Sequence, residues 1–289
     1  MIDAQMTIDR FRRDLTISAI VRRGLIGAAA VCLVLELIPM PRMISGAVLM
    51  MVVVGIWVAL SYRSARGTRL AAITPQLIAS GNLPQAEQFI HDALSSFSLF
   101  RSVKLRSLHQ LAVLRHAQER WGECAMLCRE LLQQRMGPLT PLTRSTRLIL
   151  ASSLLEIGDV AGTYMPLTSL YAERLSLGEA LELTSVQLDY LARLGQWSAM
   201  LSGLKQKLAM VELMSPARSA MSQAMLCLAA AKAGTPELMA WLKLRVEAIG
   251  EPGELIAKRP VLAEIWAEPA LSPATAEQQG TASATAEPQ

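Results

Sequence analysis

Two long apolar stretches lie back to back near the N-terminus, and they constrain this chain more than any other feature. They cover 24–40 and 43–62, with only Pro41 and Arg42 between them. The second stretch holds 20 residues without a charge, which is the length an α-helix needs to cross about 30 Å of hydrocarbon. The first is shorter and carries Glu36, so a re-entrant or buried helix is the alternative there. The pattern predicts a transmembrane helical hairpin.

Arginines on the outer flanks of the hairpin predict its orientation. They are Arg10, Arg12, Arg13, Arg22 and Arg23 before it and Arg63, Arg66 and Arg69 after it, with only Arg42 between the stretches. Basic residues collect on the cytoplasmic side of a membrane protein. We therefore expect a multi-pass protein of the cell (inner) membrane, with both termini in the cytoplasm. A cleaved signal peptide is disfavoured because 23 residues precede the first apolar core.

The net charge of the chain comes from the region around the hairpin. Residues 1–69 carry +5, 70–268 carry +1 and 269–289 carry −2, for a total of +4. A nucleic-acid-binding domain would concentrate basic charge in its folded part. The distribution therefore argues against nucleic acid as a partner.

The segment before the hairpin, 1–23, has a helical period of its own. Met6, Ile8, Phe11, Leu15 and Ile20 can share one broad face. One interpretation is a helix lying on an anionic cytoplasmic leaflet. The simpler interpretation, which we prefer, is that the arginines of this segment only set the orientation.

Beyond residue 69, turn sequences recur at regular distances. They begin at Gly81, Glu119, Gly158, Gly195 and Gly234, with spacings of 38, 39, 37 and 39 residues. Glycine readily takes the left-handed conformation that ends a helix. Only the second turn has no glycine at its first position. Two residues into each of the first four turns lies an apolar residue: Leu83, Trp121, Val160 and Trp197. Each unit is predicted to be a helix, a tight turn and a second helix, so the fold class is all-α.

The turn pattern resembles the tetratricopeptide repeat superfamily. The best match is LIASGNLPQAEQFIHDAL at 77–94, followed by LAVLRHAQERWGECAMLC at 111–128. The resemblance covers about 68–249 and supports no specific subfamily, because the period of 37–39 exceeds the usual length of about 34. It implies a TPR-like α-solenoid of stacked helix pairs with a concave face that binds proteins.

The family's inward-facing positions define a candidate protein-binding groove. Carried onto this chain, they are Arg106, His109, His116, Ser152, Glu156, Glu182, Asp189 and Arg193. For any one of these residues, an ordinary solvated face is the alternative. The mixed charge favours a folded or amphipathic partner segment of unknown identity.

Chemistry-bearing motifs are sparse. Cys124 and Cys128 stand four apart, which fits small apolar packing better than a metal site. The three histidines lack a nucleophile arrangement, and no phosphate-cradling glycine motif occurs. We therefore expect no enzyme activity, no cofactor, no metal site and no catalytic residue.

These observations predict four segments. They are a basic amphipathic segment at 1–23, the hairpin at 24–62, the repeat domain at 63–268 and a disordered tail at 269–289. The predicted function is a membrane-anchored scaffold or adaptor that presents a protein-binding surface to the cytoplasm. The alternative is a non-catalytic assembly or regulatory subunit of a membrane enzyme or transport complex.

Overall fold

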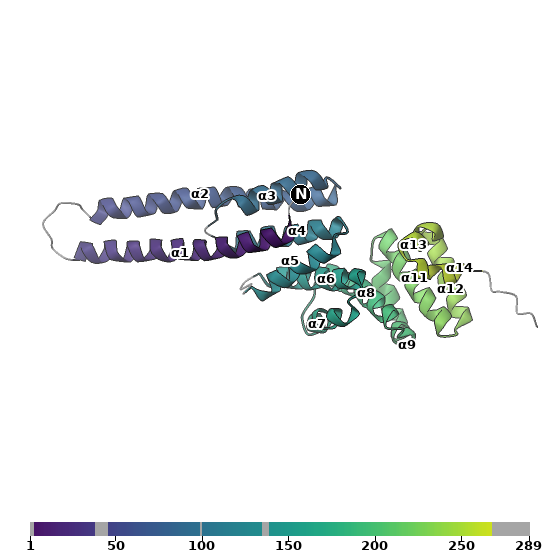
Figure 1. Ribbon diagram of the computed structural model, residues 1–289. Helices are drawn as coiled ribbons and strands as arrows, with labels where there is room; N and C mark the ends of the chain where they lie inside the picture. Colours follow the sequence, from purple (N-terminus) through teal and green to yellow (C-terminus); the bar gives the residue numbers. More distant parts are fainter. Residues whose placement is uncertain (1–2, 38–45, 99, 135–138, 268–289) are drawn as a thin grey trace, which may run out of the picture. The chain divides into compact units, whose positions relative to one another are not determined.

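The computed structural model describes residues 3–37, 46–98, 100–134 and 139–267 (Figure 1). Every regular element in these ranges is helical, which confirms the all-α fold class. The chain divides into two compact units, Met1–Val186 and Gln187–Gln289, and each is described by itself. The predicted turn at Pro41 and Arg42 and the predicted tail at 269–289 lie outside the described residues.

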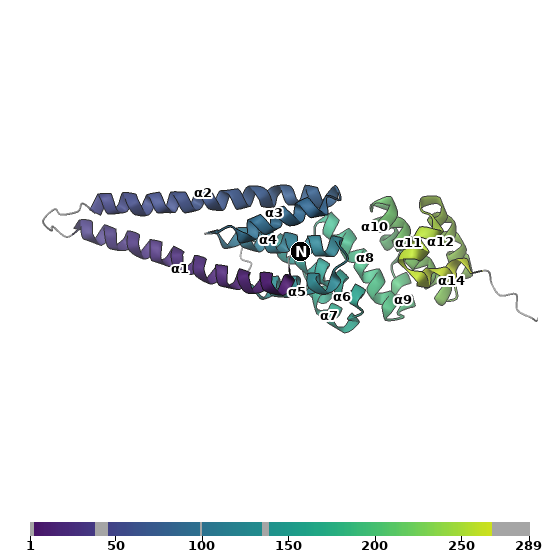
Figure 2. The same ribbon diagram turned by 45° about the horizontal axis from the view of Figure 1, so that its top comes forward.

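The first unit begins with two long helices, α1 (Ala4–Leu37) and α2 (Gly46–Ala79), which lie antiparallel and in contact (Figures 1 and 2). Neither helix breaks where the sequence changes from charged to apolar. Helix α1 continues through residues 23 and 24, and α2 continues through residues 62 and 63. Each apolar stretch is therefore joined by continuous helix to the charged segment beside it.

One described helix is long and apolar enough to cross a membrane. This is α1, over Ala4–Val34, whereas α2 contributes only a shorter apolar helix at Val48–Tyr62. Many large apolar side chains in both regions are exposed, as at Val31 (57%) and Met51 (76%). The structure thus gives one possible membrane-spanning helix, and the second span of the predicted hairpin remains a prediction.

The first turns of α1 belong to the core of the repeats. Ala4, Ile8 and Phe11 are buried, whereas Met6 and Ile20 are exposed. The buried face belongs to one apolar cluster with side chains of four later helices, including Ile90, Leu108, Leu127, Leu131 and Leu154. The N-terminal segment therefore has a packing role that neither interpretation of its sequence anticipated.

The rest of the first unit is a series of helices in which sequence neighbours pack as pairs. The helices that pack in this way are α3 (Leu83–Ser95), α4 (Arg101–Ala117), α5 (Trp121–Gln133), α6 (Thr140–Ile157) and α7 (Val160–Tyr171). Helix α8 (Leu177–Arg193) follows them and runs into the second unit. Helix α2 also packs on α3 and α4, and Leu77 and Ile78 near its C-terminus contact the apolar cluster of the repeats. The architecture is a helical repeat.

All five predicted turns are confirmed. Each predicted residue has a positive φ: 78° at Gly81, 59° at Glu119, 88° at Gly158, 67° at Gly195 and 72° at Gly234. The turns also share one hydrogen-bond pattern. At Gly81, for example, Asn82 N–H donates to Leu77 O (2.9 Å) and Gly81 N–H donates to Ile78 O (3.1 Å). This paired pattern is the Schellman motif that closes a helix C-terminus.

The second unit is less regular than the first. Its helices are α9 (Trp197–Leu201), α10 (Leu204–Glu212), α11 (Pro216–Lys232), α12 (Pro236–Ile249), α13 (Pro252–Lys258) and α14 (Ala263–Trp266), with the 3-10 helix η1 (Pro260–Leu262). One helix was predicted after the turn at Gly195. Two short helices form instead, because Gly203 adopts a φ of 66° and interrupts the hydrogen-bond ladder.

Candidate functional site

Two histidines of the predicted groove lie between α4 and α6. His109 Nε2 is hydrogen-bonded to Ser145 Oγ at 3.2 Å, and His116 Nε2 is hydrogen-bonded to Ser152 Oγ at 3.2 Å. Both pairs join residues that are 36 apart in the sequence. Because both histidines lie on α4, from position 109 to position 116, the second pair repeats the first about two helical turns further along. The His116 ring also meets Trp121 edge-on, with 4.9 Å between ring centroids. These side chains connect neighbouring repeats.

Burial changes the chemistry of His109. The side chain is 9% exposed, and burial lowers the pKa of its imidazole from 6.5 to about 4. The ring is therefore neutral at pH 7. His109 contributes a neutral hydrogen-bonding group to this seam, and no positive charge.

The remaining groove candidates are more dispersed. In the first unit, Arg106 on α4 and Glu182 on α8 are exposed, and Glu156 on α6 is half-buried. In the second unit, Asp189 forms ion pairs with Arg259 at 3.0 Å and Arg193 at 3.4 Å. The structure brings together His109, His116 and Ser152 along the α4–α6 seam. A binding role for the eight residues remains a prediction.

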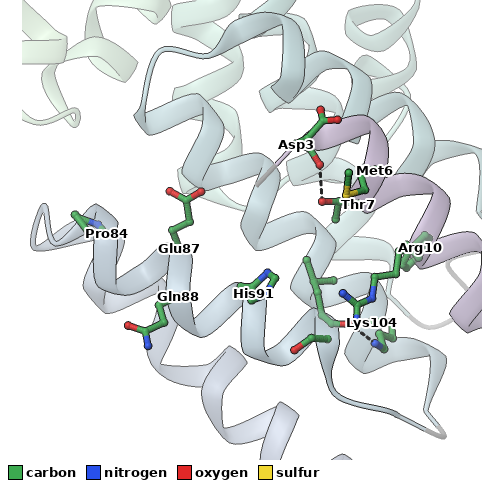
Figure 3. Close-up of a pocket in the computed structure, with 12 residues that line it drawn as sticks. Asp3, Met6, Thr7, Arg10, Pro84, Glu87, Gln88, His91 and Lys104 are labelled. Carbon is green, nitrogen blue, oxygen red and sulfur yellow. Dashed lines mark hydrogen bonds between the residues drawn. The ribbon is translucent and has the colours of Figure 1, made fainter. Parts of the chain in front are cut away.

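A pocket of about 530 Å³ lies between the first turns of α1, helix α3 and Lys104 of α4 (Figure 3). Its apolar lining includes Met6, Phe11 and Leu94, and Arg10 and His91 contribute polar side chains. None of the groove residues predicted from the sequence lines it. The sequence signal that could have indicated this pocket is the helical period of residues 6–20, because it marks an apolar face of α1 that requires a packing partner.

Lys104 forms the buried cationic end of this pocket. It is 2% exposed, and its ammonium donates hydrogen bonds to Asp14 Oδ2 at 3.0 Å and to the Leu94 carbonyl oxygen. Burial lowers the pKa of Lys104, and the hydrogen bond to Asp14 opposes that shift. Arg10 also lowers it through like-charge repulsion, so the two cations are close enough to interact.

The acidic groups of the pocket lie apart from this cationic end. Glu87 Oε1 is ion-paired at 3.1 Å with Arg115, a fully buried side chain of α4. Asp3 accepts a hydrogen bond from the Gln5 N–H at the start of α1. Arg10 and His91, in contrast, have no hydrogen bond or ion pair with any residue that the structure describes. The pocket therefore has one end with available positive charge.

The two cysteines of α5 are buried and interact with each other. Cys124 and Cys128 are both buried in α5, and Cys124 Sγ donates a hydrogen bond to Ala112 O at 3.2 Å. The hydrogen bond with Cys124 and, next to it, burial raise the pKa of Cys128, which keeps it a thiol. Within the described ranges, no three His, Cys, Asp or Glu side chains are grouped to hold a metal ion.

Comparisons of this chain with protein-family models, with curated proteins and with solved structures gave no match.

Proposed function

We propose that this chain is a membrane-anchored scaffold of TPR-like helical repeats that presents a protein-binding surface to the cytoplasm. In this proposal both apolar stretches, 24–40 and 43–62, cross the bilayer. The arginines on the outer flanks keep both termini and the repeats on the cytoplasmic side. No catalytic group is assigned.

The observation that carries the proposal is the continuity of α1 and α2. Each helix has an exposed apolar part, as at Val31 and Val54, and a part that packs on the repeats. Exposed apolar surface of this extent marks a membrane or protein contact. Because the same helices enter the repeat core, an anchor of this kind would hold the repeats at a fixed place beside the membrane.

Cysteine labelling in intact cells tests the orientation. The four native cysteines are buried, so an introduced thiol reacts against a low background. Gln85→Cys, at an exposed position of α3, should react with a membrane-impermeant maleimide only after the membrane is opened. Arg42→Cys should react from outside without that treatment. Labelling of Gln85→Cys in intact cells would refute the cytoplasmic placement.

A charge placed in the second apolar stretch tests whether it spans. Val54 is 52% exposed, and Val54→Lys should impair insertion because lysine at the centre of a span costs about 3 kcal/mol. The expected result is loss of outside labelling at Arg42→Cys. Leu213→Lys, at an exposed apolar position of the second unit, is the matched control and should change nothing. Unchanged labelling in both variants would exclude the second span.

Purification from detergent-solubilised membranes after crosslinking tests the scaffold role. The proposal predicts partner proteins whose recovery falls when exposed repeat residues such as Arg106 and Glu182 are replaced by alanine. An enzyme or transporter subunit recovered at fixed stoichiometry would favour the assembly-subunit alternative. Absence of any partner under these conditions would contradict both functions.

A further inference from the structure

We propose that the pocket between α1, α3 and Lys104 binds an acidic peptide segment in which a carboxylate side chain lies next to a bulky apolar one. The inference rests on the proposed function for the class of partner. The pocket volume, about 530 Å³, is within the range of sites that enclose a small ligand or an anchoring side chain.

The charge arrangement selects a negatively charged group. Figure 3 shows Arg10 extending from α1 toward α3, with its guanidinium between His91 and Lys104 in that view. Lys104 is held by Asp14, whereas Arg10 and His91 have no polar partner in the described part of the chain. A guanidinium with its donors available matches a carboxylate, which can accept two parallel hydrogen bonds from it.

The apolar lining selects a neighbouring apolar side chain. Phe11 and Leu94 are almost fully buried in the core and form part of the lining, and Met6, 71% exposed, lies at the rim. An unbranched methionine adapts to side chains of different shape. The combination of a cationic end and an apolar wall fits a leucine, methionine or phenylalanine adjoining an aspartate or glutamate.

Distance from the predicted bilayer argues for a peptide over a lipid headgroup. Arg10 precedes Gly24, the first residue of the apolar stretch, by 14 residues of continuous helix, or about 21 Å at about 1.5 Å per residue. The headgroup layer is about 5–8 Å thick on each side of the hydrocarbon. With α1 tilted by about 40°, the pocket would still be about 16 Å from the hydrocarbon. A lipid in the bilayer therefore does not reach it.

The test uses full-length protein in phosphatidylcholine nanodiscs and two heptapeptide libraries. One library has glutamate fixed at the centre beside Leu, Met or Phe, and the other has glutamine at that position. Peptides retained by the protein are quantified by mass spectrometry. The glutamate library should be retained about tenfold or more above the glutamine library, the difference expected for a charge-assisted hydrogen bond.

Variants assign the retention to the pocket. Arg10→Gln should reduce retention of the glutamate library about tenfold or more. Met6→Trp, which fills the rim without changing charge, should also reduce it. Arg13→Gln is the matched control, because Arg13 is an exposed arginine of the same helix outside the pocket lining. Met6 and Arg10 are exposed, so neither change removes a core side chain.

Three outcomes would overturn the inference. The first is equal retention of the two libraries, or no retention of either. The second is an equal effect of Arg10→Gln and Arg13→Gln. The third is Arg10-dependent binding of dioctanoyl-phosphatidylglycerol or inorganic phosphate without binding of the peptides, which would assign the pocket to those anions. If one of these outcomes occurs while cysteine labelling gives the expected result, only the assignment of the pocket is refuted. If the labelling itself fails, the proposed function is refuted.

Discussion

Lys104 and Asp14 form an ion pair with 3.0 Å between Nζ and Oδ2, although 90 residues separate them in the sequence. A second pair, between Arg12 and Glu130, joins the same part of α1 to α5, with Arg12 Nε 3.1 Å from Glu130 Oε1. Two residues of the segment before the apolar stretch thus make specific contacts with the repeats. Arg12 has a tertiary partner in addition to the orienting role inferred for the flanking arginines.

Asp14→Asn should destabilise the first unit. The change leaves the ammonium of Lys104 buried with the Leu94 carbonyl and a neutral amide. We expect a loss of about 1–3 kcal/mol in the free energy of unfolding, measured by urea denaturation in detergent micelles. Asp9→Asn, at an exposed position of the same helix, should change it by less than about 0.5 kcal/mol. Equal effects of the two changes would contradict a specific pair.

Phe11→Ala should destabilise the repeats themselves. Phe11 is 2% exposed and shares a core cluster with side chains of α3, α4 and α5. Removing a buried phenylalanine side chain costs about 3–5 kcal/mol. Limited proteolysis at the turns around Gly81 and Glu119 should accelerate accordingly. Ile20→Ala, at a 63% exposed position of the same helix, is the control. Unchanged proteolysis in Phe11→Ala would show that α1 is dispensable for the repeat fold.

Glu119→Gly should stabilise the protein. Glu119 is the one non-glycine residue with positive φ in the described ranges, and it occupies the turn position that glycine holds in the other four repeats. A left-handed conformation costs a residue with a Cβ about 1–2 kcal/mol, partly offset by the greater chain entropy of glycine when unfolded. We expect a gain of roughly 0.5–1 kcal/mol in urea denaturation.

The matched control for that turn is Ala117→Gly, two residues earlier and still within α4. Glycine costs about 1 kcal/mol relative to alanine in a helix interior and less at the last helical residue, so this variant should lose up to about 1 kcal/mol where Glu119→Gly gains stability. A loss in both variants would mean that Glu119 is not strained.

Stability should fall as the pH is lowered from about 6.5 to about 4. Burial lowers the pKa of His109 from 6.5 to about 4, so in this window the unfolded chain binds a proton that the folded chain does not. The stability that His109 contributes is complete above its unfolded pKa and is lost through this range, by about 3 kcal/mol in total. Thermal denaturation as a function of pH measures it.

His109→Gln separates this effect from other acid-sensitive groups. Glutamine can keep a hydrogen bond to Ser145 but does not titrate, so the slope between about pH 6.5 and 4.5 should disappear. The hydrogen bond from Arg12 lowers the pKa of Glu130, so the stability from that pair is lost only as the pH falls below about 4.5. Persistence of the upper slope in His109→Gln would refute the assignment.

Local features of this fold were predictable from the sequence, and long-range contacts were not. The five turns and the first residues of α3, α5, α7 and α9 were located because a helix end requires a left-handed residue and an apolar residue follows it. The break at Gly203 was missed, because a glycine within a helical pattern is often tolerated.

The candidate site was harder to predict, because it depends on which segments meet. The apolar face that includes Ile8 and Phe11 was identified, but its periodicity fits a membrane surface and a protein core equally well. The groove histidines both lie on α4, but their serine partners lie a whole repeat away. Position along a helix is encoded locally, whereas the partner of a side chain is set by tertiary packing.

The burial of the first turns of α1 among later helices also sets an order of events during synthesis. Ile8 leaves the ribosome early, but Leu127 and Leu131 of the same cluster follow it by more than a hundred residues. At about 5–20 residues per second, the apolar face of α1 waits roughly 6–25 s for them. The core that includes the first turns of α1 therefore cannot be completed on the nascent chain until α5 has been made. The apolar face of α1 is translated before its partners and buried only after they emerge.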